Sequence, residues 1–188
     1  DDAVKNFAVN VLAALAIVLV TLLIFMGLRS AVIIGAVLLL TIAATLATMY
    51  LLDIPMHRIS LGALIIALGM LVDNAIVVTE GILVGTQKGR SKLEITKEVI
   101  DRSIWPLLGG TLVGIIAFAP IGLAPGQTAE YTGHLFWVVM ISLMFSWVFA
   151  ITAVPFLADL LFKVEPAPDG EETEGKFMSA YKAFMRTV

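Results

Sequence analysis

The sequence contains no cysteine among its 188 residues, and it is poor in charge. Without cysteine the chain forms no disulfide and offers no thiolate to a metal or to a covalent intermediate. Charged residues make up 14% of the chain, whereas about 25% is typical of soluble proteins. The net charge of -3 argues against a nucleic-acid partner, because phosphate binding requires a concentrated basic surface.

Long uncharged runs occupy most of the remaining sequence. Four stretches carry no charged residue, namely 6–28, 30–52, 103–129 and 131–158. Each is longer than the roughly 20 residues that cross about 30 Å of hydrocarbon. A fifth stretch is apolar except for Asp73, Asn74 and Glu80. We therefore predict five membrane spans, at about 7–26, 31–52, 59–83, 104–123 and 135–162.

The predicted fold class is an all-α, polytopic membrane helix bundle, because an open sheet cannot satisfy its backbone in lipid. We expect the bundle to cover 1–163, followed by a flexible acidic linker over 164–175. Residues 176–188 have apolar side chains at helical spacing, which predicts an amphipathic helix in the membrane interface. Between the third and fourth spans, a short surface helix is expected, with Ser91 as its cap and with Leu93, Ile95, Val99 and Ile100 as its apolar residues.

Asp73 is the candidate functional residue. It lies about 3 Å from the centre of the span 59–83, where a carboxylate costs roughly 2.5 to 3.5 kcal/mol. Such a group must face a protein interior or a water-filled path, where it can load and release protons. Glu80 comes seven residues later on nearly the same helix face, which Gly62 and Gly69 continue in the other direction. Small residues there allow close helix packing.

Other roles for these polar residues stay open. Asp73 could be a structural carboxylate that is hydrogen-bonded to a neighbouring helix. Glu80 could be a solvated carboxylate that reaches the interface. Asn74 adds an uncharged donor and acceptor on the adjacent stripe, and Ser146 is predicted to be a packing hydroxyl.

Three segments carry a family resemblance. ISLGALIIALGMLVDNAIVV (59–78), PLLGGTLVGIIAFAPIGLAPG (106–126) and FSWVFAITAVPFLA (145–158) occur in this order. The sequence resembles the resistance-nodulation-division family of proton-driven efflux pumps, in its drug- and amphiphile-exporting branch. The resemblance implies that the chain holds transmembrane helices two to six of the N-terminal half, followed by a cytoplasmic surface helix.

The resemblance also implies roles for individual residues. Asp73 matches the first residue of the family's paired acidic motif, and Asn74 stands at the second, where Asp is common. Glu80 matches the family's Glu, whereas Gly81 departs from the Asn that usually follows it. The implied relay therefore consists of Asp73, Asn74 and Glu80. Only one of the two positions of the paired motif, Asp73, carries a carboxyl, and we expect Asn74→Asp to be tolerated. Protons are the coupling ion, so neither a cofactor, a metal nor enzyme activity is expected.

The expected partners follow from the same resemblance. They are the lipid bilayer, the remaining helices and the periplasmic porter domain of a homotrimeric parent pump in the bacterial inner membrane. The cationic partner of Asp73 would be a lysine on the family's tenth helix, outside this chain, so we expect an inactive piece of a longer pump that can self-associate. The alternative is a structural or assembly membrane protein without transport.

The distribution of basic residues generates the first testable prediction. Ten of the twelve lysines and arginines fall on one side of the predicted spans, which places the N-terminus in the periplasm and the C-terminus in the cytoplasm. Because the chain has no native cysteine, single cysteines report sidedness directly. An impermeant thiol reagent added from the periplasm should modify Met56→Cys in the predicted outer turn and leave Gly89→Cys unmodified. The reverse pattern would show that the orientation is wrong.

Overall fold

The computed structural model describes residues 2–54, 58–87, 91–123 and 127–162. They form five helices, α1 (Asp2–Met26), α2 (Leu28–Leu51), α3 (Arg58–Gln87), α4 (Lys92–Leu123) and α5 (Gln127–Leu161). Each helix contains an apolar stretch long enough to cross a membrane. The predicted all-α membrane bundle of five spans is thus confirmed. The predicted linker and interfacial helix, 164–175 and 176–188, lie outside the described residues.

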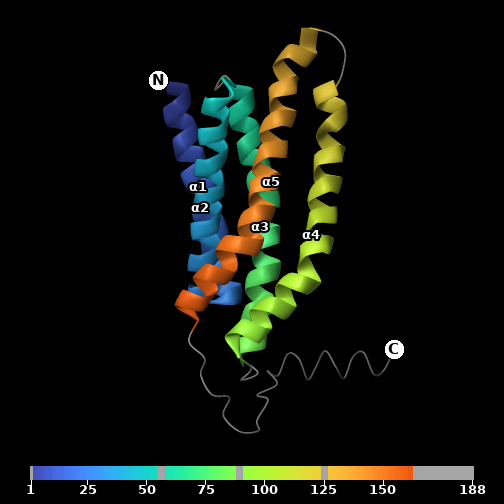
Figure 1. Cartoon of the computed structure of the whole chain (residues 1–188). Coiled ribbons are helices and arrows are strands. Elements are labelled where there is room, and N and C mark those ends of the chain that lie inside the picture. The colour runs from blue at the N-terminus through green and yellow to red at the C-terminus, as the bar shows by residue number, and fades with distance from the viewer. Residues whose placement is uncertain (1, 55–57, 88–90, 124–126, 163–188) are drawn as a thin grey trace, which may run out of the picture.

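The helices run alternately up and down, so that neighbours in sequence are antiparallel (Figure 1). After α4, the chain returns to the middle of the bundle, where α5 packs most extensively against α3 and also against α4 and α2. Helix α4 lies against α3 and α5 only. The core between these helices is made of fully buried aliphatic side chains, among them Leu64, Val78, Val139 and Val154. Burying branched aliphatic side chains brings the α3–α5 pair together at the centre.

The turn between α1 and α2 is shorter than the sequence indicates. A turn over Gly27 to Ser30 is expected from the sequence, but α2 already begins at Leu28 and only Gly27 separates the helices. Gly27 has a φ of 84°, a conformation that side chains with a Cβ rarely adopt. Its amide still donates to Leu23 O at 3.2 Å, and its carbonyl accepts from the Ala31 amide at 3.1 Å. One glycine therefore reverses the chain while both of its own backbone groups stay hydrogen-bonded.

Helix α4 begins twelve residues before the predicted span. The surface helix expected near Ser91 is not separate from the span, because one continuous helix runs from Lys92 to Leu123. Two of its predicted apolar residues explain this: Ile95 is buried and Val99 partly buried, and both pack against α3. Leu93, by contrast, is 80% exposed. Because the first turns of α4 pack against α3, the helix extends beyond the predicted span into residues that were expected to form a separate surface helix.

The start of α4 is also tied to the end of α5. The Lys92 ammonium donates to the Asp159 carbonyl at 2.8 Å and lies 3.8 Å from the Asp159 carboxylate. A cation beside the last carbonyls of a helix is favourable, although an exposed pair of this kind contributes at most about 1 kcal/mol. Prolines lie inside both helices, Pro106 and Pro120 in α4 and Pro155 in α5. Both helices bend in Figure 1, as expected where proline removes a backbone hydrogen bond.

Large side chains pack directly onto glycines where neighbouring helices meet. A Cβ at Gly35 of α2 would lie 2.5 Å from Leu19 of α1, and a Cβ at Gly122 of α4 would lie 2.5 Å from Phe136 of α5. On α3, Gly81 and Gly85 receive Val99 and Ile95 of α4. Glycine therefore allows the backbones to approach closely, as is common between membrane helices.

This glycine contact leads to a prediction for Gly85. Gly85→Ala would place a methyl group against Ile95 Cγ2, which is attached to the branched Cβ of a buried side chain and cannot swing away. The substitution should destabilise the purified chain by about 1 to 3 kcal/mol relative to a control without the clash. Gly69→Ala on the same helix is that control, because no atom lies within 4 Å of a Cβ at Gly69. Thermal unfolding in detergent measures both, and equal midpoints would contradict the prediction.

Candidate functional site

The stripe of α3 that carries the two carboxylates faces away from the other described helices. Gly69, Asp73 and Glu80 are exposed, and Gly62 is half-buried. Ile66 and Val77, which lie between them on the same stripe, are 54% and 46% exposed. The opposite side of α3 is closed by the buried side chains of Ala67, Leu71, Ala75 and Val78. We call this exposed stripe the carboxylate face.

The glycines of the carboxylate face do not pack within this chain. A Cβ at Gly62 or Gly69 would meet no atom within 4 Å. The glycines of α3 that do receive a neighbouring helix are Gly81 and Gly85, which point toward α4. The packing role predicted for Gly62 and Gly69 therefore stays a prediction, because it concerns a surface that no described helix covers.

Asp73 also lines a cavity between α3, α4 and α5. The cavity has a volume of about 450 Å³, and Gly110 and Gly114 of α4 leave the space that a larger side chain would fill. Asp73, Asn74 and Thr111 are the polar residues in its lining. The carboxyl forms no hydrogen bond or ion pair with any described residue. Asp73 is thus open to a partner, water or a proton.

Asn74 lies at the junction of three helices. Although it follows Asp73 directly, the helical turn of about 100° per residue places it on the buried side, where it is 7% exposed. Its Nδ2 donates to Thr111 Oγ1 of α4 and to Ser146 Oγ of α5, each at 3.3 Å. The Ser146 hydroxyl in turn donates to Leu71 O of α3 at 2.7 Å. The two residues of the predicted motif therefore differ in burial and bonding, although both line the same cavity.

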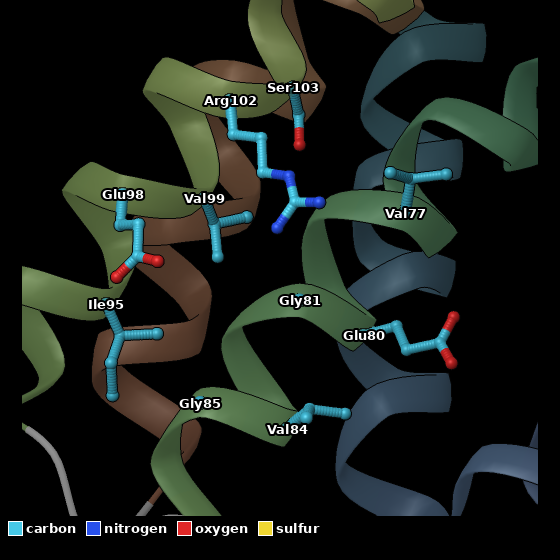
Figure 2. Close-up of a pocket in the computed structure, with 10 residues that line it drawn as sticks. All are labelled: Val77, Glu80, Gly81, Val84, Gly85, Ile95, Glu98, Val99, Arg102 and Ser103. Atoms are coloured by element: carbon cyan, nitrogen blue, oxygen red, sulfur yellow. The ribbon is translucent and has the colours of Figure 1, made fainter.

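Glu80 lines a second cavity, nearer the end of α3 (Figure 2). This space is about 670 Å³ in volume and lies between α3 and the first turns of α4. Figure 2 shows the Arg102 guanidinium pointing into the space between the helices, whereas the Glu80 carboxylate points away from α4. Glu80 forms no ion pair within the described part of the chain. Val77 lines both cavities, so it separates the space beside Asp73 from the space beside Glu80.

The structure thus divides the three predicted relay residues. Asp73 and Glu80 share the carboxylate face, about 10 Å apart along the helix, and each borders a cavity. Asn74 belongs to the interior junction instead. Among the described residues, no three His, Cys, Asp or Glu side chains are placed to hold a metal ion.

Sequence reasoning missed two contributors to this region. Thr111 was not singled out, although it accepts from Asn74, and Arg102 appeared only as one basic residue of a loop. A signal for Thr111 was present: a buried asparagine must find hydrogen-bond partners, and hydroxyls on the flanking spans are the available ones. No pattern in the sequence indicates that Arg102 borders a cavity, because this depends on how α4 starts.

Five antiparallel, apolar helices with an acidic side chain inside one span define a multi-pass membrane protein. Comparison with known proteins places it more narrowly. A sequence model of the AcrB/AcrD/AcrF family matches residues 1–188, and the chain belongs to that family. The predicted resemblance to resistance-nodulation-division transporters is thereby confirmed.

Individual relatives agree with this assignment. The swarming motility protein SwrC of Bacillus subtilis (strain 168) is 31% identical over 153 residues, which are 76% of this chain and 14% of SwrC. The multidrug resistance protein MdtC of Pectobacterium atrosepticum is 29% identical over 164 residues, or 86% of this chain and 16% of MdtC. MdtC of Escherichia coli O139:H28 is 27% identical over the same length. The chain therefore spans about a sixth of the length of these relatives.

Proposed function

We propose that this chain is the proton-translocating part of a proton-driven efflux antiporter, with Asp73 as the proton carrier. The observation that carries the proposal is the position of Asp73, an exposed carboxyl on a membrane helix beside a 450 Å³ cavity. A group that only fixed the bundle would be hydrogen-bonded to a neighbouring helix, as Asn74 is. The Asp73 carboxyl has no such bond within the described residues.

Protonation of Asp73 would change how the carboxylate face packs. An ionised carboxylate in hydrocarbon requires a cation or water, whereas the neutral acid can lie against small residues such as Gly69. A partner helix on this face would therefore bind differently in the two protonation states, which is a physical basis for coupling proton flow to movement. Glu80 stands one cavity further along the same face and is the candidate for proton exchange with the aqueous side. Val77, which borders both cavities, would be the barrier between them.

The transported substrate and the partners belong to this proposal as well. MdtC is named for multidrug resistance, which favours drugs as the exported substrates. The partners would be the remaining helices of the parent pump, including a cationic side chain facing Asp73, and its periplasmic porter domain, assembled as a homotrimer. The proposed location is the bacterial inner membrane, with the N-terminus of the chain in the periplasm.

A structural or assembly protein without transport is the second candidate. The hydrogen-bonded junction at Asn74 favours it, because such a junction stabilises a bundle without any titration. The two candidates differ in what they require of Asp73. Transport needs a titratable side chain there, whereas a scaffold needs only one of suitable size.

The proposal predicts that Asp73→Asn abolishes proton-coupled efflux by the full-length parent. Asparagine keeps the size and the hydrogen-bonding capacity of the side chain but removes its proton, so efflux of a fluorescent drug should fall to the background of cells without the pump. Asp101→Asn is the matched control, because Asp101 is exposed and lines neither cavity. The control should keep efflux near wild type. Normal efflux by Asp73→Asn, with both variants expressed equally, would refute the proposal.

A further prediction concerns the 188-residue chain alone. It should insert into liposomes and fold, yet carry no drug against an imposed pH gradient, because no described helix covers its carboxylate face. That face should instead bring two copies together, so a cysteine at Gly69 should form a disulfide-linked dimer. Ala63→Cys on the buried side of the same helix should not. Drug flux by the chain, or equal cross-linking at both positions, would contradict the prediction.

A further inference from the structure

We propose that Asn74 is a positioning residue whose two amide hydrogens are required, and that an ionised carboxylate cannot replace it. Its function is to hold the carboxylate face of α3 at a fixed rotation relative to α4 and α5. The relevance to transport rests on the proposed function of Asp73. The hydrogen-bond argument itself depends only on the described junction.

The direction of each hydrogen bond at the junction follows from its neighbours. A hydroxyl carries a single hydrogen, and both hydroxyls use it on a backbone carbonyl. Thr111 Oγ1 donates to Leu107 O at 2.8 Å, and Ser146 Oγ donates to Leu71 O at 2.7 Å. Both oxygens therefore present only lone pairs to residue 74. A side chain with two N–H groups satisfies both, and the amide of Asn74 does so.

Little solvent is available to replace these bonds. Thr111 is 4% and Ser146 1% exposed, compared with 7% for Asn74. The remaining polar atom, Asn74 Oδ1, accepts no hydrogen bond from a described residue, yet it is not among the fully buried unsatisfied atoms. This oxygen therefore keeps some exposure, and Asn74 lines the same cavity as Asp73. The donor end of the amide lies in the junction.

The junction fixes the rotation of α3 about its own axis. Ser146 contacts α3 twice, because it donates to Leu71 O and accepts from Asn74, one helical turn further along. Thr111 holds the same amide from α4. Rotating α3 enough to turn Asp73 toward or away from its cavity would break these bonds together. The position of the carboxylate face relative to the cavity is thus coupled to α4 and α5 through one side chain.

Aspartate at this position would have the wrong polarity. Ionised, it has no donor, so Thr111 and Ser146 would have to give up their carbonyl partners, and a second charge would stand beside Asp73. Protonated, it has one O–H and restores one of the two bonds. This reverses the expectation from sequence alone that Asn74→Asp is tolerated. Asp73 is the one titratable residue among those that line the cavity from α3, α4 and α5.

The first test measures thermal unfolding of the purified chain at pH 5 and pH 8. Asn74→Ala should lower the midpoint by roughly 2 to 6 °C at both pH values, because both bonds are lost without a new charge. The unfolding midpoint of Asn74→Asp should fall more at pH 8 than at pH 5, because protonation of the new carboxyl supplies a hydrogen-bond donor. An Asn74→Asp chain as stable as wild type at both pH values would overturn the proposal.

The second test measures efflux by the full-length parent. Efflux by Asn74→Asp relative to wild type should rise as the pH falls, whereas the deficit of Asn74→Ala should not change with pH. If the loss of efflux in Asn74→Asp did not change with pH, residue 74 would have only a structural role. The two proposals fail separately: normal efflux by Asp73→Asn would refute the proton carrier, while the unfolding measurements would still decide whether residue 74 needs an amide.

Discussion

Hydrocarbon neither donates nor accepts hydrogen bonds, so each polar group in a membrane span must find its partner within the protein. Six threonines of the described residues meet the requirement locally. Their hydroxyls donate to the carbonyl four residues earlier, at Thr21, Thr41, Thr45, Thr48, Thr111 and Thr152. These bonds keep the hydroxyls within their own helix. Asn74 has two N–H donors, and because these reach hydroxyls of α4 and α5, the side chain joins three helices.

Helix α3 therefore has two chemically different sides at the level of Asp73 and Asn74. On the inner side, Asn74 donates both amide hydrogens to neutral hydroxyls and lies in the core around Leu71 and Val78. On the outer side, Asp73 and Glu80 stand among glycine and aliphatic residues with no partner in the described chain. Under the proposed function, a charge change on the outer side would act on a helix whose inner side is held to α4 and α5 by hydrogen bonds.

Much of this architecture could be predicted from the sequence because charge is so costly in lipid. The uncharged runs located four spans, and the helical period placed Asp73, Glu80 and Gly69 on one face. The ends of the helices could not be located in this way, since the start of α4 depends on Ile95 packing onto Gly85 across a chain reversal. The hydrogen-bond partners of Asn74 could not be predicted from the sequence either. They lie 37 and 72 residues away, and only the tertiary fold brings Thr111 and Ser146 to it.

The glycines illustrate the same limit. Small residues at Gly62 and Gly69 predicted close packing, yet the helix neighbours within this chain approach at Gly81, Gly85, Gly35 and Gly122. A pattern of glycines indicates where two helix backbones can pack closely, but it does not indicate which helix packs there. Here the neighbour is set by chain connectivity, because each short reversal brings the next helix alongside the previous one (Figure 1).

The central place of α5 has a consequence for biogenesis. Helices emerge from the ribosome in chain order, at about 5 to 20 residues per second. In this chain the last helix supplies the main packing surface for α3 and also covers α2 and α4. Helices α1 to α4 must therefore stay in the bilayer, with Asn74 already inserted, until α5 is synthesised. Nascent chains arrested before Ser146 should be the ones that membrane quality-control proteases recognise, because their asparagine has no α5 to bind.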